Sequence, residues 1–330
     1  MSTAAEFRFK DIFLAFGYAS NREKLIVGAG GFLISILISG IWMLVFSFIF
    51  TSVRWLTGMM IFNFIGMLIF VALMSATITA VSYMVRSELD GKGKPGYSDV
   101  FRFITKQIVT IVSVPYAFIG ILLACGILQA LIGLICRIPW IGAIVYGAAY
   151  GILFAISLIM IITVMVFYLG IFLYPAIIAT HGYGLVDTIK TLFRAVRQKW
   201  IQLIGYLVIV GFLSSIVFFV AYLLFGAAFS ITTSISALVI GKNAILTTSS
   251  VAGRMLNPFL HALRDIFPLS AGSYYGGGAW YHTIGGILQM IWLAVILSVT
   301  FAYPLVFNSS AGVMVYHILM KPGGAEKKKE

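Results

Sequence analysis

The chain has 330 residues, of which 61% are hydrophobic and only 10% are charged. Apolar residues make up about half of an ordinary soluble protein, so this composition excludes an ordinary soluble domain. The net charge of +12 does not indicate a nucleic-acid partner. Its basic residues flank long apolar runs, where they are expected to face the headgroups of membrane lipids.

Six runs of the sequence contain no Asp, Glu, Lys or Arg, and roughly 20 apolar residues are enough to cross a bilayer. The shortest run has 29 residues, and the six are 25–53, 55–85, 107–136, 138–186, 200–241 and 266–320. The sequence therefore predicts an all-α, polytopic membrane helical bundle. We expect a single transmembrane domain over residues 1–320, followed by a charged tail at 321–330.

The basic residues between these runs are distributed unevenly. Seventeen of the 22 fall in residues 1–24, 86–106, 187–199 and 321–330, and five fall in the alternate segments. Basic residues near span ends stay on the cytoplasmic side of a membrane. The pattern predicts that both termini are cytoplasmic and that residues 241–282 lie on the outer side.

Taken in chain order, the spans are expected at about 25–50, 59–84, 108–135, 141–178, 201–225 (or on to 240) and 284–319. An N-terminal amphipathic segment, 1–24, precedes the first. Short amphipathic helices are also expected at 97–106 and 186–199, on the cytoplasmic surface. A turn is expected between spans two and three, where Gly91, Gly93, Pro95 and Gly96 gather.

Three aspartates, Asp11, Asp99 and Asp187, are spaced 88 residues apart, one in each amphipathic stretch. This spacing predicts a threefold repeat of an amphipathic helix and a helical hairpin. The alternative is that any six-span protein with inner loops produces such a rhythm. In either case each Asp near a helix start interacts favourably with the helix dipole.

Small residues and prolines predict how the spans pack and bend. Gly28, Gly30, Gly31 and Gly40 favour close packing of the first span. The fourth span would be about 57 Å long if it were fully helical. This exceeds a hydrocarbon core of roughly 30 Å, so the helix is expected to tilt, break near Pro175 or project from the membrane.

A ridge of small residues recurs at four-residue intervals on the fourth span: Ala143, Gly147, Gly151 and Ala155. Such spacing lets two helix backbones approach closely. The ridge predicts a helix contact, either within the chain or with a partner subunit.

The last span contains Pro304, followed by Asn308, Ser309 and Ser310. A proline removes a backbone donor, and a broken helix with polar side chains at depth is a possible binding site. The alternative is a simple kink whose freed backbone group is satisfied by those same side chains.

Four histidines offer two pairs, His181 with His317 and His261 with His282. Neither pair has a Cys or carboxylate nearby at metal-ligand spacing. We expect these histidines to cap backbone carbonyls at the interface. No metal or other cofactor is expected, and without ionisable groups at depth no catalytic residue is expected either.

Two regions resemble a known family. These are Leu173-Tyr174-Pro175-Ala176-Ile177, and the last span with Phe301-Ala302-Tyr303-Pro304, Ser309-Ser310-Ala311 and Tyr316-His317-Ile318-Leu319. Together, mainly over residues 137–320, they resemble an uncharacterised family of six-span bacterial inner-membrane proteins. The resemblance implies a bacterial inner-membrane location and carries over no functional residue.

The sequence therefore favours a non-catalytic membrane subunit that scaffolds or anchors a larger complex, with membrane lipids and other membrane protein subunits as partners and no nucleic acid. The alternative is a transporter or channel for an apolar or zwitterionic solute, with a path near Pro304 and Asn308. An enzyme acting on lipid at the cytoplasmic face would have only Glu88, Asp90 and Asp99 as candidates. These are more typical of a solvated turn.

Overall fold

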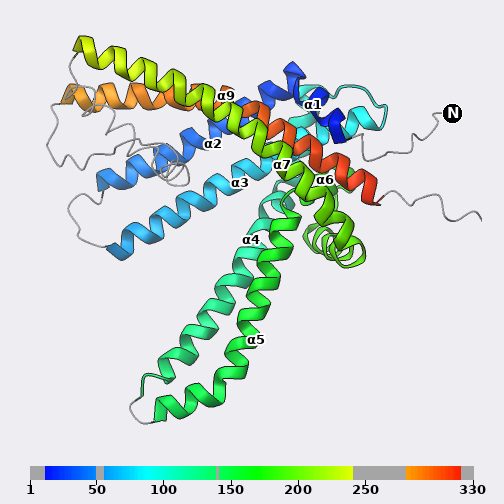
Figure 1. The fold of residues 1–330 in the computed structure, drawn as a ribbon, viewed down its shortest axis with the longest axis vertical. Helices are drawn as coiled ribbons and strands as arrows, with labels where there is room; N and C mark the ends of the chain where they lie inside the picture. Colours follow the sequence, from blue (N-terminus) through cyan, green and yellow to red (C-terminus); the bar gives the residue numbers. More distant parts are fainter. Residues whose placement is uncertain (1–11, 50–55, 139–140, 241–279, 321–330) are drawn as a thin grey trace, which may run out of the picture. The chain divides into compact units, whose positions relative to one another are not determined.

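The computed structural model describes residues 12–49, 56–138, 141–240 and 280–320 (Figure 1). Within these residues it is 92% helical and has no strand. The described helices are α1 (Leu14–Ala19), α2 (Arg22–Ile49), α3 (Leu56–Leu89), α4 (Tyr97–Ile135), α5 (Ile141–Gly170), α6 (Tyr174–His181), α7 (Leu185–Ile240) and α9 (Trp280–Met320).

Six of these helices, α2, α3, α4, α5, α7 and α9, are long and apolar enough to cross a membrane. The predicted all-α membrane fold with six spanning helices is confirmed, and the chain is a multi-pass membrane protein. Both termini and most of the predicted outer segment, 241–282, lie outside the described residues.

The described residues group into two compact units. The first comprises residues 12, 82–138, 141–210 and 311–320, and the second comprises 13–49, 56–81, 211–240 and 280–310. Helices α3, α7 and α9 contribute residues to both units. The single transmembrane domain over residues 1–320 stays a prediction.

The second unit is packed around apolar side chains of α2, α7 and α9, including Ile36, Phe225 and Ala294. Glycines of α2 allow the helices to approach closely. A Cβ added to Gly28 would lie 2.8 Å from Val306 Cγ2, and one added to Gly31 would overlap the side chain of Thr77. The predicted close packing of α2 is therefore confirmed at these two glycines, while Gly30 has open space around it.

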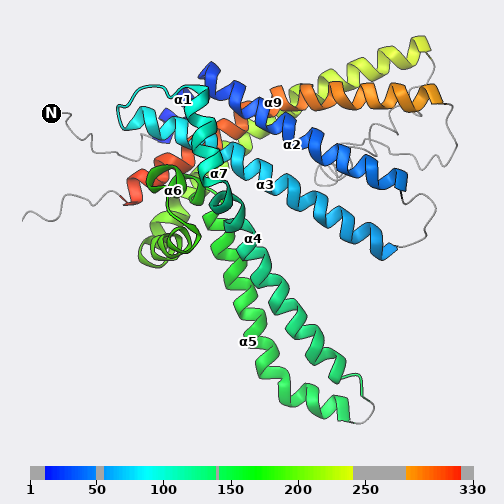
Figure 2. The same cartoon turned by 180° about the vertical axis from the view of Figure 1, so that it is seen from behind.

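In the first unit, α4 and α5 form a long helical hairpin (Figures 1 and 2). The Gln129 side-chain amide of α4 donates to Ser157 Oγ of α5 at 2.7 Å. Nearer the other end of the hairpin, the rings of Phe118 and Phe167 have centroids 5.4 Å apart. The outward faces of both helices are exposed, as expected for helices that contact lipid.

The predicted fourth span was expected to tilt, to break near Pro175 or to project from the membrane, and the structure shows the break. Helix α5 ends at Gly170, residues 171–173 form a turn, and α6 begins at Tyr174. Pro175 lies in the first turn of α6, where its missing N–H costs no helical hydrogen bond. Gly170 lies so close to α7 that an added Cβ would be 2.6 Å from Leu192 Cδ2.

The two predicted amphipathic helices at 97–106 and 186–199 are both helical, and they join the spanning helices in different ways. Residues 97–106 form the start of α4, because no Gly or Pro interrupts the chain before the spanning part begins. Residues 186–199 form the start of α7, which departs from helical geometry at Lys199 (φ −134°, ψ 30°). The predicted short helix is therefore confirmed at 186–199, where the kink separates it from the spanning part of α7, whereas at 97–106 the helix continues into the span without a break.

The predicted turn between α3 and α4 is confirmed, with Gly91 and Gly93 at φ 71° and 81°, a region that favours glycine. The Asp99 carboxylate accepts a hydrogen bond from the Gly96 N–H at 3.2 Å, at the start of α4. Asp187 lies in the first turn of α7, and Asp11 lies outside the described residues. The threefold repeat stays a prediction.

Candidate functional site

The first unit contains a polar cluster centred on Arg86, in the last turn of α3. Arg86 Nη1 donates to His317 Nδ1 of α9 at 2.6 Å, and Arg86 Nη2 forms an ion pair with Asp90 at 2.8 Å. A guanidinium group carries only donors, so His317 Nδ1 must accept.

The second histidine of this pair, His181, ends α6 beside the same region of α9. His181 Nε2 is 2.8 Å from the Tyr316 hydroxyl, and its ring is stacked on that of Tyr183, with centroids 4.5 Å apart and planes 8° from parallel. Gly182 follows in the left-handed conformation and turns the chain away. Partial burial, and next the charge of Arg86, lower the pKa of His181 below its ordinary value.

The cluster joins α3, α6 and α9 through side chains. One ring nitrogen of His181 contacts Tyr316 and one of His317 contacts Arg86, and the expectation that these histidines cap backbone carbonyls stays a prediction. A capping role does occur nearby, where the Lys199 ammonium of α7 donates to the Leu319 carbonyl in the last turn of α9. The positive charge there also favours the helix C-terminus.

The cluster is a poor setting for a cation. In the part of the chain that the structure describes, no three His, Cys, Asp or Glu side chains gather as a metal site would require. Arg86 places a fixed positive charge against both histidines. Of the other predicted pair, His261 lies outside the described residues, and only the backbone of His282 is described, in the first turn of α9.

The predicted polar kink lies in the second unit. Pro304 is inside α9 and leaves the Thr300 carbonyl without its helical donor. The hydroxyls of Ser309 and Ser310 do not replace it, since they donate to the carbonyls of Leu305 and Val306 at 2.8 and 2.7 Å. Both serines are buried on their own helix.

Asn308, the fourth residue of the predicted kink site, is paired across the unit. The hydroxyl of Ser214 on α7 donates to Asn308 Oδ1. This interhelical hydrogen bond fixes α7 against α9 below the proline. Asn308 and the serines therefore serve packing, and Pro304 alone of the four lines a cavity.

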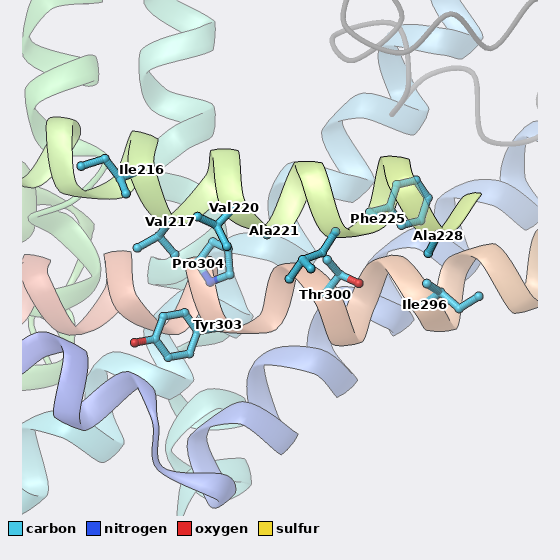
Figure 3. A pocket seen from close by; sticks show the side chains of 11 residues that line it. Ile216, Val217, Val220, Ala221, Phe225, Ala228, Ile296, Thr300, Tyr303 and Pro304 are labelled. Carbon is cyan, nitrogen blue, oxygen red and sulfur yellow. The ribbon is translucent and has the colours of Figure 1, made fainter. Parts of the chain in front are cut away.

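That cavity lies between α7 and α9 and has a volume of about 460 Å³ (Figure 3). Apolar side chains form most of its lining, and the hydroxyls of Thr300 and Tyr303 are its side-chain polar groups. A second cavity, of about 210 Å³, adjoins it and shares Phe225, Ala228 and Ile296. Both volumes are small or moderate for ligand pockets, which run from about 300 to 1,000 Å³.

The predicted small-residue ridge makes no close contact in the described chain. Gly147 and Gly151 are exposed with open space where a Cβ would stand, and Ala155 is also exposed. The side chain of Ala143 lies outside the described residues. The ridge was predicted to contact either another helix of this chain or a partner subunit. Within the described residues, the contact with another helix of this chain is absent.

Two functional contacts escaped the sequence analysis. No contact was predicted for Arg86 from the sequence, although its place directly after a charge-free run and four residues before Asp90 indicates a helix end. No contact was predicted for Lys24 either, and Lys24 is fully buried, with its ammonium 4.6 Å from the centroid of the Tyr18 ring.

Comparisons with protein-family models, with curated proteins and with solved structures find no match to this chain. The resemblance to a family of six-span bacterial inner-membrane proteins therefore stays a prediction. What the structure establishes is the class: a multi-pass, all-helical membrane protein with six membrane-spanning helices.

Proposed function

We propose that this protein is a non-catalytic membrane subunit that scaffolds or anchors a larger membrane complex. The observation that carries the proposal is the exposed ridge Gly147–Gly151–Ala155 on α5. Small residues at this interval suit close contact between helix backbones. Since nothing in the described chain covers the ridge, a helix of another subunit is the partner that fits it.

The rest of the molecule supports this proposal. Glycines at close helix contacts, such as Gly28 and Gly170, have an atom of a neighbouring helix within 3 Å of an added Cβ. At Gly147 and Gly151 a second helix could approach the backbone equally closely, but no described atom lies within 4 Å of an added Cβ. The Arg86 cluster pairs Arg86 with His317 and Asp90, and His181 with Tyr316, and such side-chain contacts between helices are typical of a structural joint.

The test uses the double variant Gly147→Leu/Gly151→Leu, with Gly120→Leu as the matched control. Gly120 is an exposed glycine of α4 with open space around it, and Ala124 is the one small residue four positions from it, so it belongs to no ridge like that of α5. Each chain is purified gently from its native membrane, and the mass of the intact assembly is measured. We expect the wild type and Gly120→Leu to retain stoichiometric subunits that the double variant loses.

Thermal unfolding separates this effect from misfolding, because the ridge has no internal contact to lose. The double variant should unfold at the same temperature as the wild type. A wild-type protein that purifies alone, or a double variant that keeps its partners, contradicts the scaffold proposal.

The location proposed with this role is the bacterial inner membrane, with both termini in the cytoplasm. It is supported by the 17-to-5 distribution of basic residues. Single cysteines at Ser2 and Gly323, in a background without Cys125 and Cys136, should resist a membrane-impermeant reagent in intact cells. A cysteine at Thr247 should react, and outside labelling of either terminus would reverse the orientation.

One observation favours the second candidate, a transporter or channel for an apolar or zwitterionic solute: the cavity beside Pro304. The polar part of the predicted path is weaker, because Asn308 is already hydrogen-bonded to Ser214. Uptake of a radiolabelled betaine into liposomes containing the protein, compared with empty liposomes, tests the zwitterionic case. Equal uptake by both removes its support.

A further inference from the structure

The two cavities between α7 and α9 form one elongated groove, because Phe225, Ala228 and Ile296 line both. The groove runs along α7 from Ile216 to Thr233, which is about 26 Å at 1.5 Å per residue. Its width is the gap between two neighbouring helices (Figure 3). Such a shape suits one extended chain better than a compact solute.

The floor and the rim of the groove differ in exposure. Ala221 and Phe225 on the floor are buried and belong to the apolar core of the second unit. Val220 and Leu224 on the rim are 51% and 67% exposed. Since α7 and α9 are spanning helices, this exposed rim lies against bilayer hydrocarbon. A ligand therefore enters sideways from the membrane.

Polar groups are concentrated at one end of the groove. The smaller cavity is lined by Thr232, Thr233, Gln289 and Trp292. The threonine hydroxyls donate to the Ala228 and Phe229 carbonyls, both at 2.8 Å, which leaves their oxygens available as acceptors. The indole N–H of Trp292 is a donor, and the Trp292 side chain is 67% exposed.

Among the described residues that line the two cavities, none has a charged side chain. A phosphate or carboxylate head would have no cation to pair with there, and leaving a charge unpaired at depth is costly. A head with hydroxyl and ester groups matches the hydroxyl, amide and indole groups at this end.

We propose that the groove between α7 and α9 binds a single-chain, uncharged lipid of the monoacylglycerol type. Its chain lies along Val217, Ala221 and Phe225 toward Pro304, and its polar head lies by Thr233, Gln289 and Trp292. The hydroxyls of Thr300 and Tyr303 stand beside the far part of the chain. This assignment does not rest on the scaffold proposal and holds whether or not the chain has a partner subunit.

The test uses monopalmitoylglycerol with a photoactivatable diazirine, added to the full-length protein in lipid nanodiscs. A diazirine at the chain end should label the region of Pro304 and Val217. A diazirine beside the ester should label the region of Gln289 and Trp292. Mass spectrometry of the cross-linked peptides identifies the labelled residues.

A cavity-filling variant and its neighbour provide the control. Ala228→Trp fills the groove where the two cavities meet, whereas Ala227→Trp adds the same bulk at an exposed position that lines neither. Labelling should fall about tenfold in Ala228→Trp, the change that corresponds to about 1.4 kcal/mol of binding free energy. Ala227→Trp should be labelled like the wild type.

Competition in the wild-type protein keeps the test decisive if Ala228→Trp fails to fold. Unlabelled monopalmitoylglycerol should displace the probe in a saturable manner, and palmitate should displace it far less well. Labelling that is not saturable, or is spread over other lipid-facing positions such as Phe154 and Val164 of α5, overturns the site. Equal displacement by palmitate overturns the assignment of an uncharged head.

Discussion

Helix α9 and both helices of the α4–α5 hairpin are apolar enough to span a membrane, yet they are used in opposite ways. In the most apolar stretch of α9, 56% of residues are buried within the protein, against 11% in α4 and 11% in α5. Helix α9 is the one around which other helices pack, and the hairpin presents most of its surface outward. Hydropathy alone does not separate the two, since both sequences predict a span.

Small residues account for part of the difference. Gly312 of α9 lies so close to the Phe172 backbone that an added Cβ would overlap its carbonyl, and Ser309 and Ser310 are buried beside it in sequence. The hairpin has the more regular pattern, with Gly147 and Gly151 four residues apart, and makes no such contact. A regular spacing of small residues therefore indicates that another helix can approach closely, but it does not indicate which helix does so.

The largest effect expected from this comparison is that of Gly312→Ala. The new methyl group would strike a backbone carbonyl, which cannot rotate away, so we expect a loss of about 3 kcal/mol of stability. Gly147→Ala is the control. It adds the same methyl group in open space, where alanine favours a helix over glycine by about 0.5–1 kcal/mol.

Thermal unfolding of both variants in detergent, followed by circular dichroism, measures this contrast. Gly312→Ala should unfold well below the wild type, and Gly147→Ala at or slightly above it. If the two variants unfold together, the buried and exposed helices do not differ in the way described.

A smaller effect is expected from Arg86→Leu, which removes the donor to His317 and the partner of Asp90. Breaking hydrogen bonds that involve a charged group costs about 1.5–3 kcal/mol. Arg102→Leu, at an exposed position in the first turns of α4, should change the unfolding temperature little. Equal losses in both variants would show that the cluster adds nothing to the attachment of α9.

The smallest effect concerns pH. The pKa of His181 is lowered in the folded protein, so the unfolded chain binds a proton more readily. The neutral ring therefore contributes its full stability above the unfolded pKa of about 6.5, and the contribution is lost as the pH falls below that value. Melting temperatures of the wild type should decline over this acid range.

The variant His181→Gln keeps a hydrogen-bonding side chain beside Tyr316 and has no proton to gain in this range. Its melting temperature should depend less on pH than that of the wild type. A parallel decline in both proteins would assign the acid sensitivity to groups other than His181.

The spans were predictable because their signal is continuous over many residues. Charge-free runs located all six long helices, and Pro175 correctly marked the break after α5. The connections between amphipathic and spanning segments were less predictable. Residues 97–106 look amphipathic by themselves, but they continue without a break into the spanning part of α4. Periodicity reports which face is apolar and is silent about where a helix stops.

The candidate sites show the same limit. Pro304 was correctly singled out and lines a cavity, but α7, which supplies most of the other lining residues, lies about 80 positions earlier in the chain. The role of Arg86 depends on His317, 231 positions away. Contacts between residues so far apart are set by which helices become neighbours, and a single sequence does not encode that in any local pattern.

Lys199 connects the bend in α7 to the C-terminal end of α9. It is the residue at which α7 bends, and its ammonium also closes the end of α9 at Leu319. One side chain thus ties the angle of a surface segment to the axial position of a membrane-spanning helix. If α9 moved along its own axis, the bend at Lys199 would change with it. A displacement of residues 185–198 would in turn act on the C-terminal end of α9.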